Sequence, residues 1–322
     1  MKTRKLGTNG PFLSVVGLGT WAQGGGGWLY GWGDQNDAES IAAIHAGLDA
    51  GINWIDTAAV YGLGRAEEVT GLAVEGRRNS VFIATKCGRI SDDGGKTIKA
   101  DISPKSIRSE CEASLKRLKT SYIDLYQIHW PVEDLNAVRE AWTAVNELIR
   151  EGKIRFAGVS NFNKAQLEAC CEISVPASLQ PPYSMLRRGI EGEIIPFCAE
   201  KGIGITAYSP MERGLLTGKF TKEKAAALPG NDHRKRDGRF NEPQLSGNLA
   251  LVENLRPIAA NLEITLSQLA LAWVLRKQAV TAAIAGARNI EQAVTNAAAG
   301  DVVLDETIIN KIESILSEYN RQ

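Results

Sequence analysis

Eight short β-rich runs alternate with amphipathic helical segments along the 322-residue chain. Most of these runs are apolar throughout, which favours parallel strands that are covered on both faces. Eight is also the number of strands that closes a (β/α)₈ barrel, a fold that typically takes about 250 residues. The pattern therefore predicts an α/β fold of the (β/α)₈ TIM-barrel type, although the pattern alone also permits an open doubly wound sheet. The runs are residues 13–20, 52–57, 80–86, 123–129, 154–160, 177–180, 204–210 and 281–286.

Both ends of the chain add an element to this repeat. The stretch "TNGP" breaks the first apolar segment and favours a β-hairpin with its turn at residues 8–10 over a signal peptide. Asp305 opens a last helix with an apolar stripe that includes Ile312 and Leu316. We expect residues 1–322 to form a single barrel domain with an N-terminal β-hairpin and a C-terminal helix.

Three helix starts between these ends carry recognisable capping signals. Ser103 precedes a proline at the first helical position, a combination typical of an N-cap. Asn163 with Gln166, and Thr265 with Gln268, have the spacing of capping boxes. By contrast, the stretch from about residue 220 to 247 reads as a long irregular loop, and such loops in compact domains are usually functional lids or disordered.

Composition limits the classes of partner. The chain has 37 basic and 37 acidic residues, which gives no reason to expect nucleic acid or an anionic membrane as a partner. Its five cysteines show neither a CxxC pair nor the spacing of metal ligands, so we expect free thiols, no metal site and a reducing compartment, the cytoplasm. No run approaches the length of a membrane span. Nothing in the sequence indicates an oligomer.

Polar or ionisable residues end nearly every predicted strand. In a (β/α)₈ barrel the carboxyl ends of all strands meet at one rim, where catalytic residues lie. A single polar strand end is often only a helix cap, but so many on one rim indicate the functional site. These strand-end residues are Thr20, Asp56, Lys86, His129, Ser160, Asn161, Gln180, Tyr208 and Ser209.

Two of these strand ends predict an ion pair. Asp56 follows "NWI" and Lys86 follows "VFIAT", so we expect the two side chains to meet, because a buried carboxylate needs a partner. Tyr61, in the loop after Asp56, is within reach of this pair, and a nearby ammonium lowers the pKa of a phenol from about 10. With His129 as a hydrogen-bond donor, these residues suit proton delivery to a carbonyl oxygen. They form neither a nucleophile relay nor a metal site, so the other reactant must come from a cofactor.

Several stretches resemble the aldo-keto reductases, in particular the bacterial branch that is similar to potassium-channel β subunits. The motifs "WIDTAAVYG", "IATK" and "IHWP" look like the segments that carry the catalytic tetrad of this family. The resemblance continues through "VGLGTW", "GKIRFAGVSNF", "RGLLTGKF" and "AIAGARNIEQAVTN" and covers nearly the whole chain. It implies an NADPH-dependent oxidoreductase that reduces an aldehyde or ketone, including sugar-like carbonyls, to the alcohol.

The resemblance also implies a role for each matching residue. Tyr61 would protonate the carbonyl oxygen, Lys86 and Asp56 would lower its pKa, and His129 would orient the substrate. Arg288 would bind the 2′-phosphate and favour NADPH over NADH. The long loop after Lys219 would act as a partial clasp. The full set of implied cofactor contacts is Thr20, Trp21, Asp56, Ser160, Asn161, Gln180, Tyr208, Ser209, Pro210, Gly214, Leu215, Lys219, Gly286, Ala287, Arg288, Gln292 and Asn296.

Two departures from the family pattern bear on the site. Prolines 181 and 182 follow Gln180 where relatives more often carry a polar pair, which predicts a differently shaped floor for the nicotinamide. Gln292 stands where many relatives have an arginine, so Arg288 carries the predicted NADPH preference with less help.

A glycine-rich segment rich in aromatics predicts the walls of the substrate pocket. We expect "WAQGGGGWLYGWGDQ" to be mobile and to lie over the mouth of the barrel, with some of its aromatics only packing the loop down. The predicted substrate pocket consists of Trp21, Trp28, Tyr30, Trp32 and Trp130.

Four other interpretations each match part of the sequence. "GLGTWA" satisfies the dinucleotide fingerprint GxGxxG/A but is followed by "QGGGGW" instead of a helix, and "GLLTGKF" is one residue short of a P-loop. An aldolase that uses Lys86 as a Schiff base is disfavoured, because Asp56 would keep the amine protonated. A regulatory subunit that binds a nicotinamide cofactor with little turnover remains the alternative function.

Overall fold

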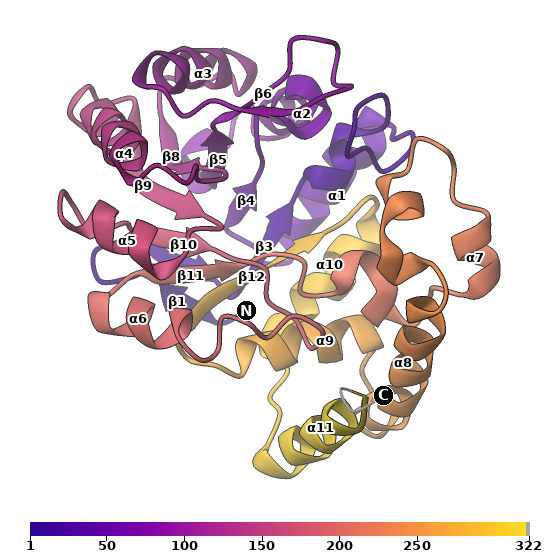
Figure 1. The fold of residues 1–322 in the computed structure, drawn as a ribbon. Coiled ribbons are helices and arrows are strands. Elements are labelled where there is room, and N and C mark those ends of the chain that lie inside the picture. The colour runs from indigo at the N-terminus through magenta and orange to yellow at the C-terminus, as the bar shows by residue number, and fades with distance from the viewer. Residues whose placement is uncertain (320–322) are drawn as a thin grey trace.

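A closed barrel of eight parallel strands forms the centre of the computed structural model, which describes residues 1–319 (Figure 1). Each strand pairs with the next in chain order, and β12 pairs with β3 to close the ring. The prediction of a (β/α)₈ barrel is therefore confirmed. The barrel strands are β3 (Val16–Gly19), β4 (Trp54–Asp56), β5 (Phe82–Cys87), β8 (Ile123–Ile128), β9 (Ile154–Ser160), β10 (Ser178–Gln180), β11 (Gly204–Ala207) and β12 (Val280–Gly286).

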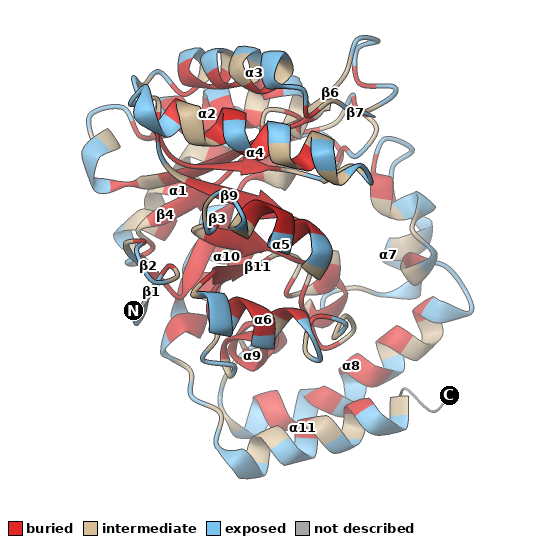
Figure 2. Cartoon of the chain, turned by 60° about the vertical axis from the view of Figure 1, so that its left-hand side comes forward, coloured by how far each residue is buried: buried red, intermediate tan, exposed pale blue. Residues whose placement is uncertain are grey.

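Helices surround this barrel and bury the outer faces of its strands (Figure 2). Two of them, α8 and α11, lie side by side away from the ring, and the Tyr319 hydroxyl donates to Asn248 Oδ1 at 2.7 Å between them. The helices are α1 (Asp37–Asp49), α2 (Arg65–Ala73), α3 (Pro104–Arg117), α4 (Leu135–Arg150), α5 (Lys164–Cys171), α6 (Ile194–Lys201), α7 (Lys222–Ala226), α8 (Gln244–Asn261), α9 (Leu266–Leu275), α10 (Ile290–Ala298) and α11 (Glu306–Tyr319).

The predicted helix starts are confirmed. Ser103 caps α3 with Pro104 in the first turn. The capping boxes of Asn163 and Thr265 are complete, each with its glutamine reaching back to the cap. Local sequence therefore positions these helices before any packing contact is considered.

An N-terminal hairpin closes the amino-terminal end of the barrel. Strands β1 (Thr3–Lys5) and β2 (Phe12–Ser14) pair antiparallel around the predicted turn. Leu6 and Leu13 are fully buried and pack against Trp54 and other residues inside the barrel. The hairpin thus supplies the apolar floor of the barrel.

This hairpin corrects the predicted strand at residues 13–20. The run is split between β2 and β3, because Ser14 turns the chain at Val15. The Ser14 hydroxyl donates to the Val16 carbonyl at 2.7 Å, and the Trp54 indole donates to the Ser14 carbonyl at 2.9 Å. Two strands that follow each other without a loop look like one run in the sequence.

The segment from residue 220 to 247 is also more ordered than predicted. It contains α7, two single helical turns at His233–Arg236 and Gly238–Phe240, and the first residues of α8. Aspartates cap both turns, since Asp232 and Asp237 accept backbone N–H groups two residues further on. Short capped turns lack the periodicity that predicts a helix from sequence.

The five cysteines are free thiols, and four of them are buried. Residues 1–319 contain no group of three or more His, Cys, Asp or Glu side chains arranged to hold a metal ion. Within the same residues no single helix is both long and apolar enough to cross a membrane, and α8 and α9 meet the length and composition test only as a pair bent by 89°.

Candidate active site

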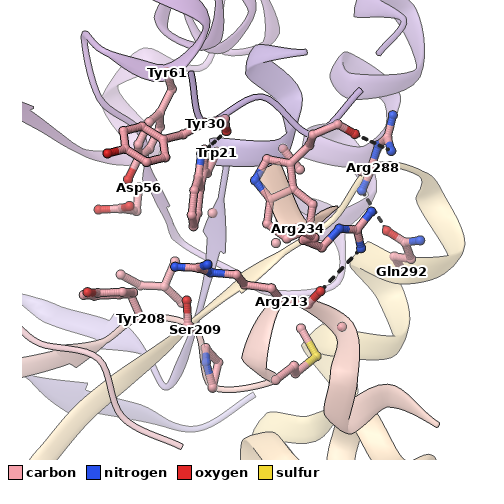
Figure 3. A pocket seen from close by; sticks show the side chains of 18 of the residues that line it. Trp21, Tyr30, Asp56, Tyr61, Tyr208, Ser209, Arg213, Arg234, Arg288 and Gln292 are labelled. Atoms are coloured by element: carbon pink, nitrogen blue, oxygen red, sulfur yellow. Dashed lines mark hydrogen bonds between the residues drawn. The ribbon is translucent and has the colours of Figure 1, made fainter. Parts of the chain in front are cut away.

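One cavity of about 790 Å³ opens at the carboxyl ends of the barrel strands. Figure 3 shows Asp56 and Tyr61 at one end of it and Arg288 and Gln292 at the other, with Arg213 and Arg234 between them. The predicted rim is therefore the wall of a single long pocket. The predicted site residues that line it are Trp21, Trp28, Tyr30, Trp32, Asp56, Tyr61, His129, Trp130, Ser160, Asn161, Gln180, Tyr208, Ser209, Pro210, Gly214, Lys219, Gly286, Arg288, Gln292 and Asn296.

The predicted pair of Asp56 and Lys86 is confirmed. The Lys86 ammonium donates to Asp56 Oδ1 at 2.7 Å and to the Thr57 carbonyl at 2.8 Å, and both charged side chains are buried. It also lies 3.3 Å from the Tyr61 hydroxyl. The second carboxylate oxygen of Asp56 accepts from Gln180 Nε2 at 2.7 Å. Each oxygen of the buried carboxylate thus has a partner, and the phenol of Tyr61 is in contact with the ammonium.

His129 lies beside this group. Its backbone N–H donates to the Cys87 carbonyl at 2.9 Å, which ties the end of β8 to the end of β5. Its ring stands edge-on to the Tyr61 ring, with 5.7 Å between the ring centroids. Burial, helped by the nearby charges of Lys86 and Arg89, holds the pKa of His129 well below its usual range. The imidazole is therefore neutral at pH 7 and keeps one N–H to donate.

The pKa of Tyr61 moves in the direction opposite to the sequence-based prediction. Burial raises the pKa of Tyr61 well above 10, and the Asp56 carboxylate adds to this rise. Burial also lowers the pKa of Lys86, although its contact with Asp56 opposes the decrease. The reason is that desolvation penalises both the phenolate and the ammonium, a cost that charge pairing by sequence does not reveal.

A chain of amides and hydroxyls lines the cavity next to Asp56, at the carboxyl ends of the strands. The Tyr208 hydroxyl donates to Asn161 Oδ1 at 2.9 Å, and Asn161 Nδ2 donates to Ser160 Oγ at 2.9 Å. Ser160 Oγ in turn donates to the Gln180 carbonyl at 2.8 Å. Asn161 has a φ of 63°, a left-handed conformation that asparagine tolerates best after glycine. These contacts hold three polar side chains at fixed positions beside the Asp56 carboxylate.

The aromatic segment and the segment after α7 clasp each other over the cavity. Trp32 pairs with Asp232 as an antiparallel bridge, and the His233 N–H donates to the Gly31 carbonyl at 2.8 Å. The His233 ring stacks on Trp21 with a centroid separation of 4.8 Å. Arg234 lies 4.7 Å from the Trp32 ring centroid while it is paired with Asp232. The segment predicted to be mobile is therefore fastened on one side of the mouth.

Comparison with known proteins identifies the family. Residues 15–317 match the model of the aldo/keto reductase family. The chain belongs to this family. It is 37% identical to the aldo-keto reductase YhdN of Bacillus subtilis over 90% of this chain and 86% of the relative. It is 34% identical to the NADH-specific methylglyoxal reductase of Escherichia coli over 98% and 99%.

Two further matches bear on the fold and on the branch. The chain is similar to the solved structure of a glycerol dehydrogenase from Gluconobacter oxydans, with a TM-score of 0.87, 35% identity and coverage of 99% and 96% of the two chains. It is also 32% identical to a probable voltage-gated potassium channel subunit beta of rice, over 98% of this chain and 97% of that one. The predicted likeness to the channel subunits is confirmed.

Members of this family use nicotinamide cofactors, and the cavity of this chain fits such a group. Its amide and hydroxyl end next to Asp56 suits the nicotinamide carboxamide, while cations line its middle and far end. Arg213 Nε is buried and has no hydrogen-bond partner among residues 1–319. A buried guanidinium N–H without an acceptor is costly, so an anionic diphosphate in the middle of the cavity would satisfy it.

The far end of the cavity holds the Arg288 guanidinium among neutral hydrogen-bond acceptors. Arg288 Nε donates to Gln35 Oε1 at 2.6 Å, and its guanidinium also donates to the carbonyls of Trp32 and Asp34. Gln292 Oε1 accepts the Arg288 backbone N–H at 2.9 Å. The guanidinium therefore lies at the predicted position, where it donates to neutral acceptors. These contacts leave the choice between NADH and NADPH open.

Four predicted site residues do not line the cavity. Thr20 donates its backbone N–H and its hydroxyl to the Asp56 carbonyl, at 2.9 and 3.1 Å, and so supports the strand end. Leu215 packs with Phe240 and Leu245 in a separate apolar cluster. Ala287 is buried in the main core, and Lys86 lies behind Asp56 and Tyr61. Motif matching finds these positions but not the direction of their side chains.

The sequence analysis missed three arginines on the cavity wall: Arg89, Arg213 and Arg234. Arg89 follows Lys86 by three residues, and Arg213 precedes Gly214 in "RGLLTG", so both stand next to predicted site residues. Arg213 pairs with Asp237 at 2.5 Å and lies 5.3 Å from the Trp21 ring centroid. Because Arg89 and Arg213 stand next to predicted site residues in the sequence, that position could have indicated both of them.

Proposed function

We propose that this protein reduces the carbonyl group of an aldehyde or ketone to an alcohol, with NADPH as the preferred hydride donor. The observation that carries this proposal is the contact of the Tyr61 hydroxyl with the Lys86–Asp56 pair, 3.3 Å from the ammonium, at the wall of the large cavity. NADPH, when bound, supplies the hydride. The protein supplies the proton, the positions of both reactants and the exclusion of water.

The proton comes from Tyr61. Its hydroxyl donates to the carbonyl oxygen as that oxygen gains negative charge, and the neutral His129 imidazole donates a hydrogen bond to the same oxygen. The phenolate that forms is stabilised by the Lys86 ammonium, which Asp56 holds in place through the 2.7 Å contact. The product is the alcohol, and Tyr61 regains its proton from solvent.

The raised pKa of Tyr61 suits the reduction direction. A phenol whose pKa lies well above 10 is fully protonated at neutral pH, so each molecule carries the proton that reduction consumes. The protonated phenol is the form that the proposed reduction uses.

The NADPH preference rests on the charge of Arg288. We expect the variant Arg288→Ala to lose NADPH affinity by about 10- to 100-fold, because it removes a charge-assisted contact to the 2′-phosphate, while NADH affinity changes little. Tryptophan fluorescence titration with both cofactors measures this difference. Lys235→Ala is the matched control, since it removes an exposed cation of the clasp that does not line the cavity. Equal binding of NADH and NADPH by the wild type would contradict the preference, and the NADH-specific relative makes this a sharp test.

The similarity to a channel subunit supports the alternative of a cofactor-binding regulatory protein with little turnover. The variant Tyr61→Phe separates the two. If the protein is an enzyme, the variant binds NADPH as the wild type does, but its kcat for aldehyde reduction falls by about 10²- to 10⁴-fold. A wild type that binds NADPH tightly but reduces no aldehyde in a broad screen would favour the regulatory function. Unchanged turnover in the variant would refute the role of Tyr61.

The remaining parts of the proposal concern location and partners. The five free thiols and the balanced charge support a cytoplasmic protein that acts on small carbonyl compounds and binds neither nucleic acid nor membranes. Gel filtration with light scattering would establish whether it works as a monomer.

A further inference from the structure

Arg89 brings a positive charge to the substrate end of the cavity. It begins a small hairpin of β6 (Arg89–Ile90) and β7 (Lys99–Ala100), which follows β5 directly. Arg89 and Ile98 of this hairpin both line the cavity. The Cys87 carbonyl, two residues before Arg89, accepts the His129 N–H at 2.9 Å, so the hairpin starts next to the catalytic histidine.

This arginine makes no ion pair and no side-chain hydrogen bond with any of residues 1–319 whose contacts are described, although it is half-buried. Its guanidinium carbon lies 6.0 Å from the centroid of the Trp130 ring, which is its one side-chain contact of note. The acidic residues of the hairpin are engaged elsewhere. Asp92 pairs with Lys99 at 2.6 Å, and Asp93 accepts from the Thr97 hydroxyl at 2.7 Å.

The half-buried carboxyl group that contacts the start of this hairpin is also occupied. Glu110 of α3 accepts the Gly88 N–H at 2.9 Å and the Ser106 hydroxyl at 3.1 Å. Removing a cation from water is costly unless an acid pairs with it, and Arg89 has lost part of its contact with water. Arg89 therefore presents an unneutralised charge to the cavity.

The charge of Arg89 is separate from the cations that suit the cofactor. Arg234 and Arg288 lie in the middle and at the far end of the cavity, away from Tyr61 (Figure 3). Arg213 lies against Trp21, but Asp237 neutralises its charge. Arg89 faces the ring of Trp130, the residue directly after His129, which places it at the proton-donating end. An anion bound there would belong to the substrate and not to the cofactor.

We propose that Arg89 binds a carboxylate group of the substrate, so that the preferred substrates are short aldehydes or ketones that also carry a carboxylate. This inference rests on the proposed function. The remaining walls at this end are aromatic or aliphatic, namely Trp28, Trp130, Val60 and Ile98. One guanidinium matches one carboxylate in charge and in its two-pronged geometry. A phosphate dianion would leave a second charge against apolar walls, which disfavours it.

The test compares two substrates of equal chain length, 4-oxobutanoate and butanal, with NADPH. We expect the wild type to have a higher kcat/KM for 4-oxobutanoate. In Arg89→Gln, the ratio of the two kcat/KM values falls by about 10- to 100-fold, the usual effect of a hydrogen bond to a charged group. Arg89→Lys retains part of the ratio. Lys96→Gln, which removes an exposed charge from the same hairpin outside the cavity, keeps the wild-type ratio.

A wild type that prefers butanal would overturn the inference, and so would equal ratios in Arg89→Gln and Lys96→Gln. The phosphate alternative is tested with glyceraldehyde 3-phosphate and glyceraldehyde. If the ratio of kcat/KM within this pair exceeds the ratio of 4-oxobutanoate to butanal, the group that Arg89 binds is a phosphate and not a carboxylate.

A turnover-independent measurement separates this inference from the proposed function. Butanedioate binding, followed by tryptophan fluorescence, should weaken about tenfold or more in Arg89→Gln even if the protein reduces no aldehyde. Unchanged butanedioate binding would also overturn it, and unchanged NADPH affinity shows that the variant is folded.

Discussion

At the residue scale, the chemistry depends on how a buried carboxylate is satisfied. Asp56 has both oxygens engaged, one by Lys86 and one by Gln180, each at 2.7 Å. Only Lys86 brings a compensating charge. Its ammonium also contacts the hydroxyl of Tyr61, the proposed proton donor, so a single lysine serves both the barrel interior and the proposed site. We therefore propose that stability and catalysis are coupled at this residue.

This coupling predicts a large loss of stability in Lys86→Met. The variant leaves the buried Asp56 carboxylate without a counter-charge, which typically costs about 3–5 kcal/mol of unfolding free energy. The double variant Asp56→Asn/Lys86→Met removes both charges and should recover a large part of this loss. Urea unfolding of the three proteins measures it. Equal stability of the single and double variants would mean that the unpaired carboxylate is not the cause.

At the element scale, the N-terminal hairpin contributes side chains to the barrel core. Leu6 and Leu13 fill the floor of the barrel, whereas Phe12, next to Leu13 on β2, is 63% exposed. The difference follows from the alternation of side chains along a strand. The hairpin should therefore unfold together with the barrel.

A matched pair of variants on β2 tests this role. Leu13→Ala should lower the free energy of unfolding by about 2–5 kcal/mol, because it removes a buried side chain and leaves a cavity. Phe12→Ala should change it by less than about 0.5 kcal/mol, since the ring is largely exposed. Thermal or urea unfolding measures both. Similar losses in the two variants would show that the hairpin does not contribute to the core.

At the scale of the whole molecule, one carboxyl group links stability to pH. Burial raises the pKa of Glu110 to about 7, although hydrogen bonds from Gly88 and Ser106 oppose this rise. In the unfolded chain the pKa of a glutamate is about 4.3. Between these values the folded state binds more protons than the unfolded state, so stability is highest at low pH and falls as pH rises through 7.

We therefore expect Glu110→Gln to reduce the pH dependence of unfolding. The wild type should lose up to about 3 kcal/mol from Glu110 between pH 5 and pH 8, and the variant should lack this part of the change. Urea unfolding at the two pH values measures it. Glu112→Gln, an exposed residue on the same helix, serves as the control and should keep the wild-type slope. If Glu110→Gln shows that slope too, the carboxyl titrates near its unfolded value.

The sequence by itself determined the order of the eight strands, the helix starts and the identity of the residues at the strand ends. These features follow from local physics, because apolar runs, capping boxes and turn residues act over a few positions. It also predicted that Asp56, Tyr61 and Lys86 would meet, since the ends of neighbouring parallel strands lie at one edge.

Only the tertiary structure decided where the side chains point and how far each is removed from water. It turned Thr20, Leu215 and Ala287 away from the cavity and brought Arg89 and Arg213 to its wall. It also reversed the predicted shift in the pKa of Tyr61. Desolvation depends on every atom packed around a group, and those atoms come from distant parts of the chain, so no local pattern carries this information.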